Sequence, residues 1–431
     1  MARGWLKLGL LIGLSLLGLG LGVSLWLVSQ RAPLPAGFHL MGISLKGVHA
    51  VQLSDWLTQL DQVLGDLPVQ VEQAPSMVYP LREWGVRLDI SRTCNAIMQA
   101  WKGVPFWQRL LGNARAEISP HWQVDEQQFT QRLQGFRWLE RTPRDARVRY
   151  QQGVVEIVPE QVGQRLSVQG SLQNLLQAVI RAGRTGVTEP AAVHFQLAIE
   201  PIVPRITRDT LQPIVGVIAS YTTRFSGYQI NRNHNIRLAA KALDGRILLP
   251  GERLSYNEAV GERTLKQGFR LAPVIIRGQK RLGIGGGICQ VSSTLFNAAL
   301  LAELKVVRRV NHSIPVPYVP PGRDATVSDT GLDLIIENAL PHPVALSVEM
   351  GRSHLTVRVL GKPREGRKVI LRTQRLRPRP MRIALWRLVY QDGQLLRRER
   401  VAISTYRPPR LNQSDVQTPS AGTPTLHRMR P

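Results

Sequence analysis

The chain has 431 residues, enough for two or three domains, and 43% of them are hydrophobic, which excludes an extensively disordered chain. Its two cysteines exclude a disulfide-rich scaffold and any multi-cysteine zinc or iron–sulfur site. The formal net charge of +26, from 56 lysines and arginines against 30 acidic residues, predicts an anionic partner. Nucleic acid, lipid head groups and a cell-wall polymer all fit that description.

Residues 1–30 predict a short cytoplasmic stub followed by a transmembrane anchor. The stretch from Leu8 to Val28 is uncharged and long enough to cross a bilayer as a helix. Arg3 and Lys7 precede it without an acidic residue, which favours a cytoplasmic N-terminus. We therefore expect a single-pass protein of the cytoplasmic membrane with its main body outside the cytoplasm. A cleaved signal peptide is the alternative. Both interpretations disfavour nucleic acid as the partner, and no nucleic-acid-binding motif is present.

The next part of the chain predicts a linker and then an α+β domain. Residues 31–50 are rich in proline and glycine and predict a linker. Residues 51–210 alternate between helical and strand patterns, so we expect an α+β domain there. Its clearest elements are helices at 51–64 and 171–182, two strands around Gln152 and Gly153, and a strand at 193–204.

A second α+β domain is expected at 214–361, followed by a basic β-rich segment at 362–410. Residues 351–410 contain 17 lysines and arginines against three acidic residues, which is about half of the excess charge. Asp392 and Gly393 predict the turn of a β-hairpin. We expect this charge to lie away from the site described next. The polar and proline-rich residues 411–431 predict a disordered tail.

The second predicted domain contains a pattern typical of a nucleophilic cysteine. Gly285, Gly286 and Gly287 precede Cys289, which begins an apolar helical pattern. The positive end of a helix dipole stabilises a thiolate at that position. A glycine run lets the backbone approach a substrate and present N–H groups to an oxyanion.

His312 and Asp324 follow Cys289 at a spacing that a helix and two strands can span, so that both residues fold back over the cysteine. We therefore predict Cys289 as nucleophile, His312 as base and Asp324 as the residue that orients it, with Gln290 or glycine-run amides at the oxyanion. The order of the residues and the helix-borne cysteine resemble a transglutaminase or papain-like core, although no tryptophan follows Cys289.

Other interpretations of this cluster remain open. The glycine run can be a simple turn, and Cys289 can be packed rather than reactive. Cys289, His312 and Asp324 could ligate a metal, but their spacing matches no short metal motif, so we expect no metal and no cofactor. Cys94, which we expect to be a buried small hydrophobe on a helix, could form a disulfide with Cys289.

Residues 222–338 closely resemble the VanW-like family, which is associated with vancomycin resistance and bacterial envelopes. The match is carried by Arg232, Asn235-Ile236, Pro250-Gly251-Glu252, Ser255-Tyr256-Asn257, Gly261, Arg263, Gly285 to Gln290, Ser293-Thr294-Leu295, Arg309, His312-Ser313, Tyr318, Gly322 and Asp324-Ala325-Thr326. From this set we predict ligand-binding roles for Gly285, Gly286, Gly287, Ser293, Tyr318, Arg232 and Asn235. Residues 75–200 resemble the YoaR-like peptidoglycan-binding domain that often precedes this module, through IVPEQVGQRLSVQGSLQNLLQAVI and PRITRDTL.

The resemblance implies an envelope location and a peptidoglycan partner, and it names no reaction. We therefore predict a membrane-anchored protein outside the cytoplasm that binds peptidoglycan or an associated anionic polymer. The alternative is a cysteine-dependent hydrolase or acyltransferase on cell-wall peptides that uses Cys289, His312 and Asp324. A third possibility is a scaffold in which the same cluster only organises the fold. The sequence leaves the oligomeric state open.

Overall fold

The structure is a computed structural model that describes residues 33–185, 192–276 and 279–407. The predicted membrane anchor, residues 1–30, and the predicted tail, residues 411–431, lie outside these ranges. Within the described ranges, no helix is both long and apolar enough to cross a membrane. The anchor therefore stays a prediction.

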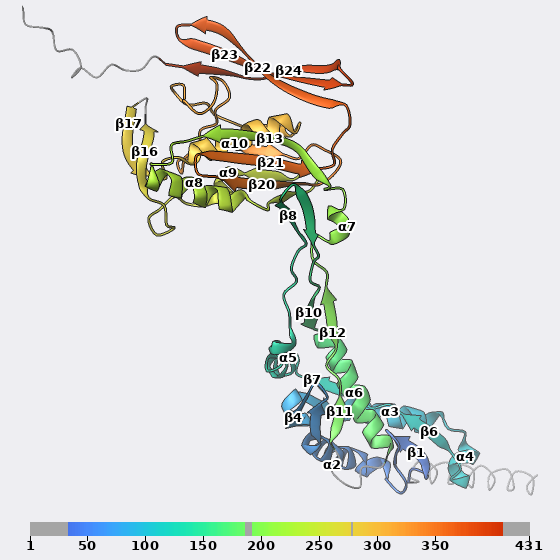
Figure 1. The fold of residues 1–431 in the computed structure, drawn as a ribbon. Coiled ribbons are helices and arrows are strands. Elements are labelled where there is room, and N and C mark those ends of the chain that lie inside the picture. The colour runs from blue at the N-terminus through green and yellow to red at the C-terminus, as the bar shows by residue number, and fades with distance from the viewer. Residues whose placement is uncertain (1–32, 186–191, 277–278, 408–431) are drawn as a thin grey trace, which may run out of the picture. The chain divides into compact units, whose positions relative to one another are not determined.

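The chain forms two compact units, and both mix helices with strands, as the sequence predicts (Figure 1). Of the described residues, the first contains those up to Arg144 together with those of Val162–Val203, and the second contains Asp145–Gln161 together with those from Pro204 onward. The chain thus crosses between the units more than once.

The first unit consists of short helices and small sheets. Its strands pair in the orders β2-β1-β6, β11-β3-β4, β5-β7 and β10-β12. Its elements are β1 (Gly37–Leu40), β2 (Ile43–Ser44), η1 (Ala50–Gln52), α2 (Leu53–Asp66), β3 (Pro68–Val71), β4 (Ala74–Pro80), η2 (Leu81–Trp84), β5 (Val86–Leu88), α3 (Ile90–Gly103), α4 (Phe106–Leu111), β6 (Arg115–Ile118), β7 (Trp122–Val124), α5 (Glu126–Gln134), η3 (Arg137–Leu139), β10 (Gly163–Leu166), α6 (Val168–Arg184), β11 (Val193–Phe195) and β12 (Ile199–Ile202).

The helices expected in this unit form where their apolar periodicity predicts them, as α2 and α6. Ser167 caps the N-terminus of α6, where its hydroxyl accepts a hydrogen bond from the Gly170 N–H at 3.2 Å, and the helix buries Leu175 and Val179 on one face. The strand expected at 193–204 is divided between β11 and β12.

The predicted linker, residues 31–50, is instead part of the first unit over its described length. Phe38 and Leu40 are fully buried in the core, and β1 pairs in parallel with β6. Leu34 and Leu45 are also buried. The prediction was wrong because the proline and glycine content conceals an apolar set that the core buries.

The second unit contains an antiparallel sheet in the order β13-β21-β20-β14 and smaller sheets in the orders β15-β19-β18, β16-β17, β22-β23-β24 and β8-β9. Its elements are β8 (Arg147–Gln151), β9 (Val154–Val158), α7 (Arg208–Leu211), β13 (Gly216–Arg224), α8 (Ile230–Leu243), β14 (Ile247–Leu248), β15 (Arg253–Ser255), α9 (Tyr256–Val260), β16 (Leu271–Ile276), β17 (Gln279–Ile284), α10 (Ile288–Leu301), β18 (Lys305–Arg308), β19 (Ile335–Glu337), β20 (Val344–Met350), β21 (His354–Gly361), β22 (Arg367–Pro378), β23 (Met381–Gln391) and β24 (Gln394–Tyr406).

Helix α10 is the centre of this unit. It packs against β13 and β21 of the sheet, against α8 and against β22 (Figure 1). Because it is covered on several sides, its polar side chains are buried with its apolar ones, and Thr294 bonds Thr223 of β13 at 2.9 Å. A helix enclosed in this way can hold its N-terminal residues in a fixed geometry.

The hairpin formed by β8 and β9 belongs to the second unit, whereas the sequence-based division placed the whole of 51–210 in one domain. Val148 of β8 is buried in an apolar cluster with Leu211 and Leu360. This packing explains why the hairpin joins the later part of the chain. Its turn lies at Gln152 and Gly153, as predicted.

The basic C-terminal segment forms the predicted strands, β22, β23 and β24, with Asp392 and Gly393 at the turn of the last hairpin. Both turn residues have positive φ, 51° and 83°, as a two-residue hairpin turn requires. This sheet packs on the end of α10: buried Arg387 donates to the Leu304 carbonyl oxygen at 2.9 Å. Tyr406, at the end of β24, donates to Asp324 Oδ1, so the expected separation of the basic segment from the cysteine site was wrong.

Candidate active site

Cys289 lies in the first turn of α10, and the glycine run before it is required by close packing. Gly287 caps the helix with φ of 109°, a conformation that favours glycine. A Cβ on Gly286 would lie 2.5 Å from the carbonyl oxygen of Pro273, so only glycine fits there. The run therefore brings the start of α10 against β16, and Cys289 remains half-buried rather than enclosed.

The structure brings Cys289, His312 and Asp324 together. His312 follows β18, and its imidazole lies within hydrogen-bonding reach of the Cys289 thiol. The His312 Nδ1 atom lies 2.7 Å from Asp324 Oδ2, which leaves Nε2 to face the thiol. The same carboxylate oxygen accepts the His312 backbone N–H at 2.6 Å. The three residues that the sequence predicts as nucleophile, base and orienting carboxylate therefore lie side by side.

Asp324 is held in place by two further residues. The Arg309 guanidinium donates to Asp324 Oδ1 at 3.2 Å and to the Asp324 carbonyl oxygen at 2.6 Å. The Tyr406 hydroxyl, at the end of β24, donates to Oδ1 and accepts the Gly322 N–H at 2.6 Å. Arg309 is among the residues that carry the family resemblance. Tyr406 lies outside the matched segment, and no local pattern in the sequence indicates its role.

The electrostatics of the cluster favour a thiolate paired with an imidazolium. Burial raises the pKa of Cys289, but the hydrogen bond and positive charge of His312 outweigh it, so the pKa lies below the ordinary value. Burial lowers the pKa of His312, but the bonds to Asp324 and Cys289 raise it overall to about 9. Burial also opposes ionisation of Asp324, and His312 with Arg309 nevertheless hold its pKa below the usual range.

Gln290 does not have the predicted oxyanion role. Its side chain is buried, and its amide nitrogen donates to Thr223 Oγ1 at 2.9 Å and to the Arg224 carbonyl oxygen at 3.0 Å. Both amide hydrogens are therefore used within the fold. The Gln290 Oε1 atom instead accepts a hydrogen bond from Arg232 Nη2 at 2.7 Å. Gln290 thus joins α10 to β13 and positions Arg232.

Asn235 and Ser293, which we predicted as ligand-binding residues, are fully buried structural residues. The Asn235 amide donates to the carbonyl oxygens of Arg270 and Gly286 and accepts the Arg270 N–H, so it fastens the glycine run to α8. The Ser293 hydroxyl donates to the Cys289 carbonyl oxygen at 2.7 Å and accepts the Ala325 N–H at 2.9 Å. Neither side chain faces an open site.

Of the remaining predicted ligand-binding residues, Gly285 and Gly286 are buried, whereas Gly287, Tyr318 and Arg232 are half-buried. The Tyr318 phenol lies within electrostatic reach of Cys289, and burial together with that thiolate raises the pKa of Tyr318 well above its ordinary value. Tyr318 is therefore a neutral hydroxyl beside the thiol. Tyr318 and Arg232 are the predicted residues best placed to meet a ligand.

Both cysteines, Cys94 and Cys289, are free thiols. Cys94 lies on α3 and packs against the core of the first unit. Among the residues that the structure describes, no group of three or more histidine, cysteine or acidic side chains is arranged to hold a metal ion.

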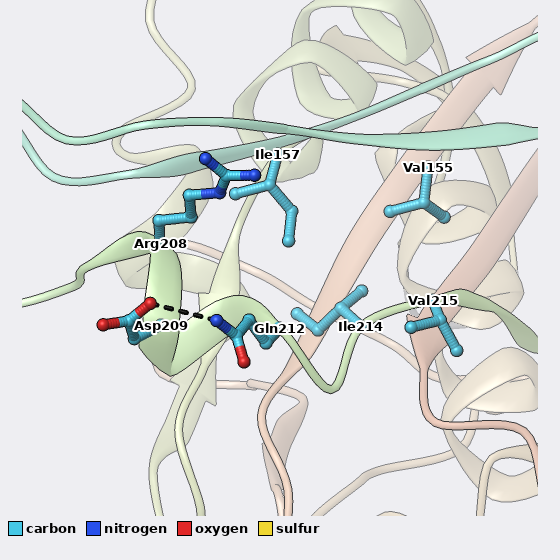
Figure 2. Close-up of a pocket in the computed structure, with 7 residues that line it drawn as sticks. All are labelled: Val155, Ile157, Arg208, Asp209, Gln212, Ile214 and Val215. Atoms are coloured by element: carbon cyan, nitrogen blue, oxygen red, sulfur yellow. Dashed lines mark hydrogen bonds between the residues drawn. The ribbon is translucent and has the colours of Figure 1, made fainter.

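A hollow of about 690 Å³ in the second unit lies apart from the cysteine cluster (Figure 2). Val155 and Ile157 of β9 line it, opposite α7 and the residues that follow that helix. Asp209 accepts a hydrogen bond from Gln212 at 3.0 Å on its wall. Its lining residues include no cysteine, serine or histidine, so the candidate chemistry remains with Cys289.

Comparison with known proteins confirms the two resemblances. Residues 231–360 match the family described as "VanW like protein", and residues 77–185 match "Putative peptidoglycan binding domain". The first region contains Cys289, His312 and Asp324.

The chain is similar to two curated bacterial proteins. It is 39% identical over 191 residues, 44% of this chain, to "Uncharacterized protein YoaR" of Bacillus subtilis (strain 168). It is 33% identical over 116 residues, 26% of this chain, to "Vancomycin B-type resistance protein VanW" of Enterococcus faecalis (strain ATCC 700802 / V583). The matches span 60% and 42% of the lengths of these relatives. No solved structure is significantly similar to the chain.

Proposed function

We propose that this chain is a cell-envelope protein that binds peptidoglycan and uses Cys289 for acyl transfer on the peptide part of that polymer. The observation that carries the proposal is the placement of a half-buried thiol at the N-terminus of α10, beside a histidine whose other nitrogen is held by a buried carboxylate. The lowered pKa of Cys289 and the raised pKa of His312 are those of a nucleophile and the proton donor that it needs.

In the proposed reaction the Cys289 thiolate attacks the carbonyl carbon of an amide bond. A C–S bond forms, the C–N bond breaks, and the His312 imidazolium gives its proton to the leaving amine. Water or the amine of a second peptide then attacks the thioester, gives its proton to His312 and releases the thiolate. Asp324 keeps the imidazole oriented throughout and stabilises its charged form.

Peptidoglycan is the proposed substrate because the domain that precedes the cysteine cluster in the chain matches a family named for binding it. The basic residues of β22–β24 support attraction to an anionic wall. We also propose that residues 1–30 anchor the protein in the cytoplasmic membrane with its body outside. Cell fractionation tests this: the protein should leave the membrane fraction when the anchor is removed, and an unchanged distribution would reject the anchor.

The catalytic proposal is tested by incubating the purified protein with muropeptides and separating the products by liquid chromatography and mass spectrometry. The wild type should release or exchange peptide fragments, whereas Cys289→Ala should lose more than about 99% of that activity, because the nucleophile is absent. Cys94→Ala, which removes the thiol of the first unit, should retain it. Equal product formation by wild type and Cys289→Ala would contradict the proposal.

Binding without catalysis is the second candidate function. The observation that favours it is that His312 is only 6% exposed and that its carboxylate partner also holds Arg309 and Tyr406, so the cluster contributes to the fold as well. In that case Cys289→Ala would retain full binding to isolated sacculi and would show no other defect.

A further inference from the structure

Arg232 lies directly against the N-terminus of the helix that carries Cys289. A Cβ on Gly287 would meet Arg232 Cγ at 2.9 Å and the Arg232 carbonyl oxygen at 3.0 Å, so the absence of a side chain at Gly287 lets the arginine lie there. The guanidinium is fixed by Gln290 Oε1 at 2.7 Å and lies within electrostatic reach of Cys289 and Tyr318. The arginine is thus directed to the proposed site of reaction.

The charge of Arg232 is not matched by a carboxylate. Within the described part of the chain, no aspartate or glutamate lies within ion-pairing distance of it. Arg263 and Arg309, which also lie near the cluster, differ in this respect: Arg263 pairs with Asp329 at 2.5 Å, and Arg309 pairs with Asp324. A guanidinium has five N–H donors, and Gln290 takes only one of those of Arg232. The donors that remain can bind the two oxygens of a carboxylate in a bidentate geometry.

We propose that Arg232 binds a carboxylate of the acyl substrate and thereby selects peptides that carry a free carboxylate next to the bond that Cys289 attacks. This inference rests on the proposed nucleophilic role of Cys289. It adds the substrate class: an acidic peptide with the negative charge close to the scissile carbonyl group. Gln290, which holds Arg232, is the positioning residue for this interaction.

Two small alkylating agents test the inference without knowledge of the natural substrate. Iodoacetate and iodoacetamide both alkylate a thiolate through their iodine-bearing CH₂ carbon and release iodide. Only iodoacetate carries a carboxylate. Peptide mapping by mass spectrometry gives the rate of alkylation of Cys289 by each agent. The ratio of the two rates cancels changes in thiolate population or access, because both agents report on the same thiol.

The expected result is that Arg232→Gln lowers the iodoacetate-to-iodoacetamide ratio by about five-fold or more, since a nearby positive charge no longer attracts the carboxylate. Arg232→Lys should keep part of the preference. Arg237→Gln removes an equal charge from an exposed position of the same helix and should leave the ratio at the wild-type value.

The outcomes separate this inference from the proposed function. If wild type and Arg232→Gln give the same ratio while Cys289 reacts readily, the carboxylate role is rejected and the nucleophile remains. A fall of the same size in Arg237→Gln would also reject it, because general charge would then explain the effect. If Cys289 reacts with neither agent in the wild type, both the nucleophile and the carboxylate site are rejected.

Discussion

At the scale of single residues, the main feature of this molecule is a chain of charged groups that ends at a thiol. Arg309 and Tyr406 hold Asp324, Asp324 holds His312, and His312 faces Cys289. Each group stabilises the charged form of the next one, so the pKa of the Cys289 thiol is lowered while that of the His312 imidazole is raised. The histidine and the aspartate are almost fully buried, which keeps water from weakening these interactions.

Replacing Asp324 should therefore affect stability as well as chemistry. In Asp324→Asn, Arg309 is left buried without its counter-charge, and we expect the free energy of unfolding to fall by about 3–5 kcal/mol. The free energy of unfolding is measured by urea titration, with hydrogen exchange of α10 peptides as the signal. Asp209→Asn, at an exposed position of the same unit, should change it by less than about 0.5 kcal/mol. Equal values for the two variants would show that Asp324 does not hold the network together.

The sequence was sufficient to predict that Cys289, His312 and Asp324 lie together, because cysteine, histidine and aspartate each have a distinctive chemistry and the three are close in the chain. It was not sufficient for Gln290 or Asn235, whose types fit a ligand-binding role equally well. Their side chains are directed inward by contacts with β13 and with the glycine run, and such contacts have no local signature. Tyr406 was missed for the same reason.

At the scale of elements, helix α10 and the glycine run before it determine the site. The helix is enclosed by a sheet and by α8, and the run allows β16 and α8 to approach its N-terminus. Periodicity predicted α2 and α6, and turn residues predicted two hairpins, because these signals are local. The burial of Phe38 and Leu40 and the transfer of the hairpin β8–β9 to the second unit depend on partners distant in sequence.

The glycine run gives a test at this scale. A methyl group at Gly286 would meet the Pro273 carbonyl oxygen at 2.5 Å, and neither backbone can move away easily. We expect Gly286→Ala to lower the free energy of unfolding by about 1–3 kcal/mol, measured by the same urea experiment. A Cβ on Gly227 would lie at an ordinary contact distance of 3.4 Å from the Arg352 carbonyl oxygen, so Gly227→Ala should change the free energy of unfolding little. Similar values for both would mean that α10 does not depend on this close approach.

At the scale of the whole molecule, the basic C-terminal sheet has two roles. Its buried residues join it to the rest of the unit: Tyr406 bonds Asp324 of the cysteine cluster, and Arg387 bonds the Leu300 carbonyl oxygen near the C-terminal end of α10. Arg372, Arg375 and Arg377 of β22 are exposed and contribute to the net charge of +26. About half of the excess charge that first indicated an anionic partner therefore lies in the part of the chain that also contributes Tyr406 to the proposed site. Under the proposed function, attraction to the wall and chemistry on it belong to one compact unit.

The state of the Cys289 thiol is the most direct test of the proposed chemistry. Thiolate absorbance near 240 nm can be followed against pH for the wild type, with Cys289→Ala subtracted so that only this thiol is observed. Because the pKa of Cys289 is lowered, the thiolate should form at lower pH than in an ordinary cysteine, whose pKa is about 8.5. His312→Gln should move that midpoint upward. A wild-type midpoint at or above the ordinary value, unchanged in His312→Gln, would contradict the proposed nucleophile.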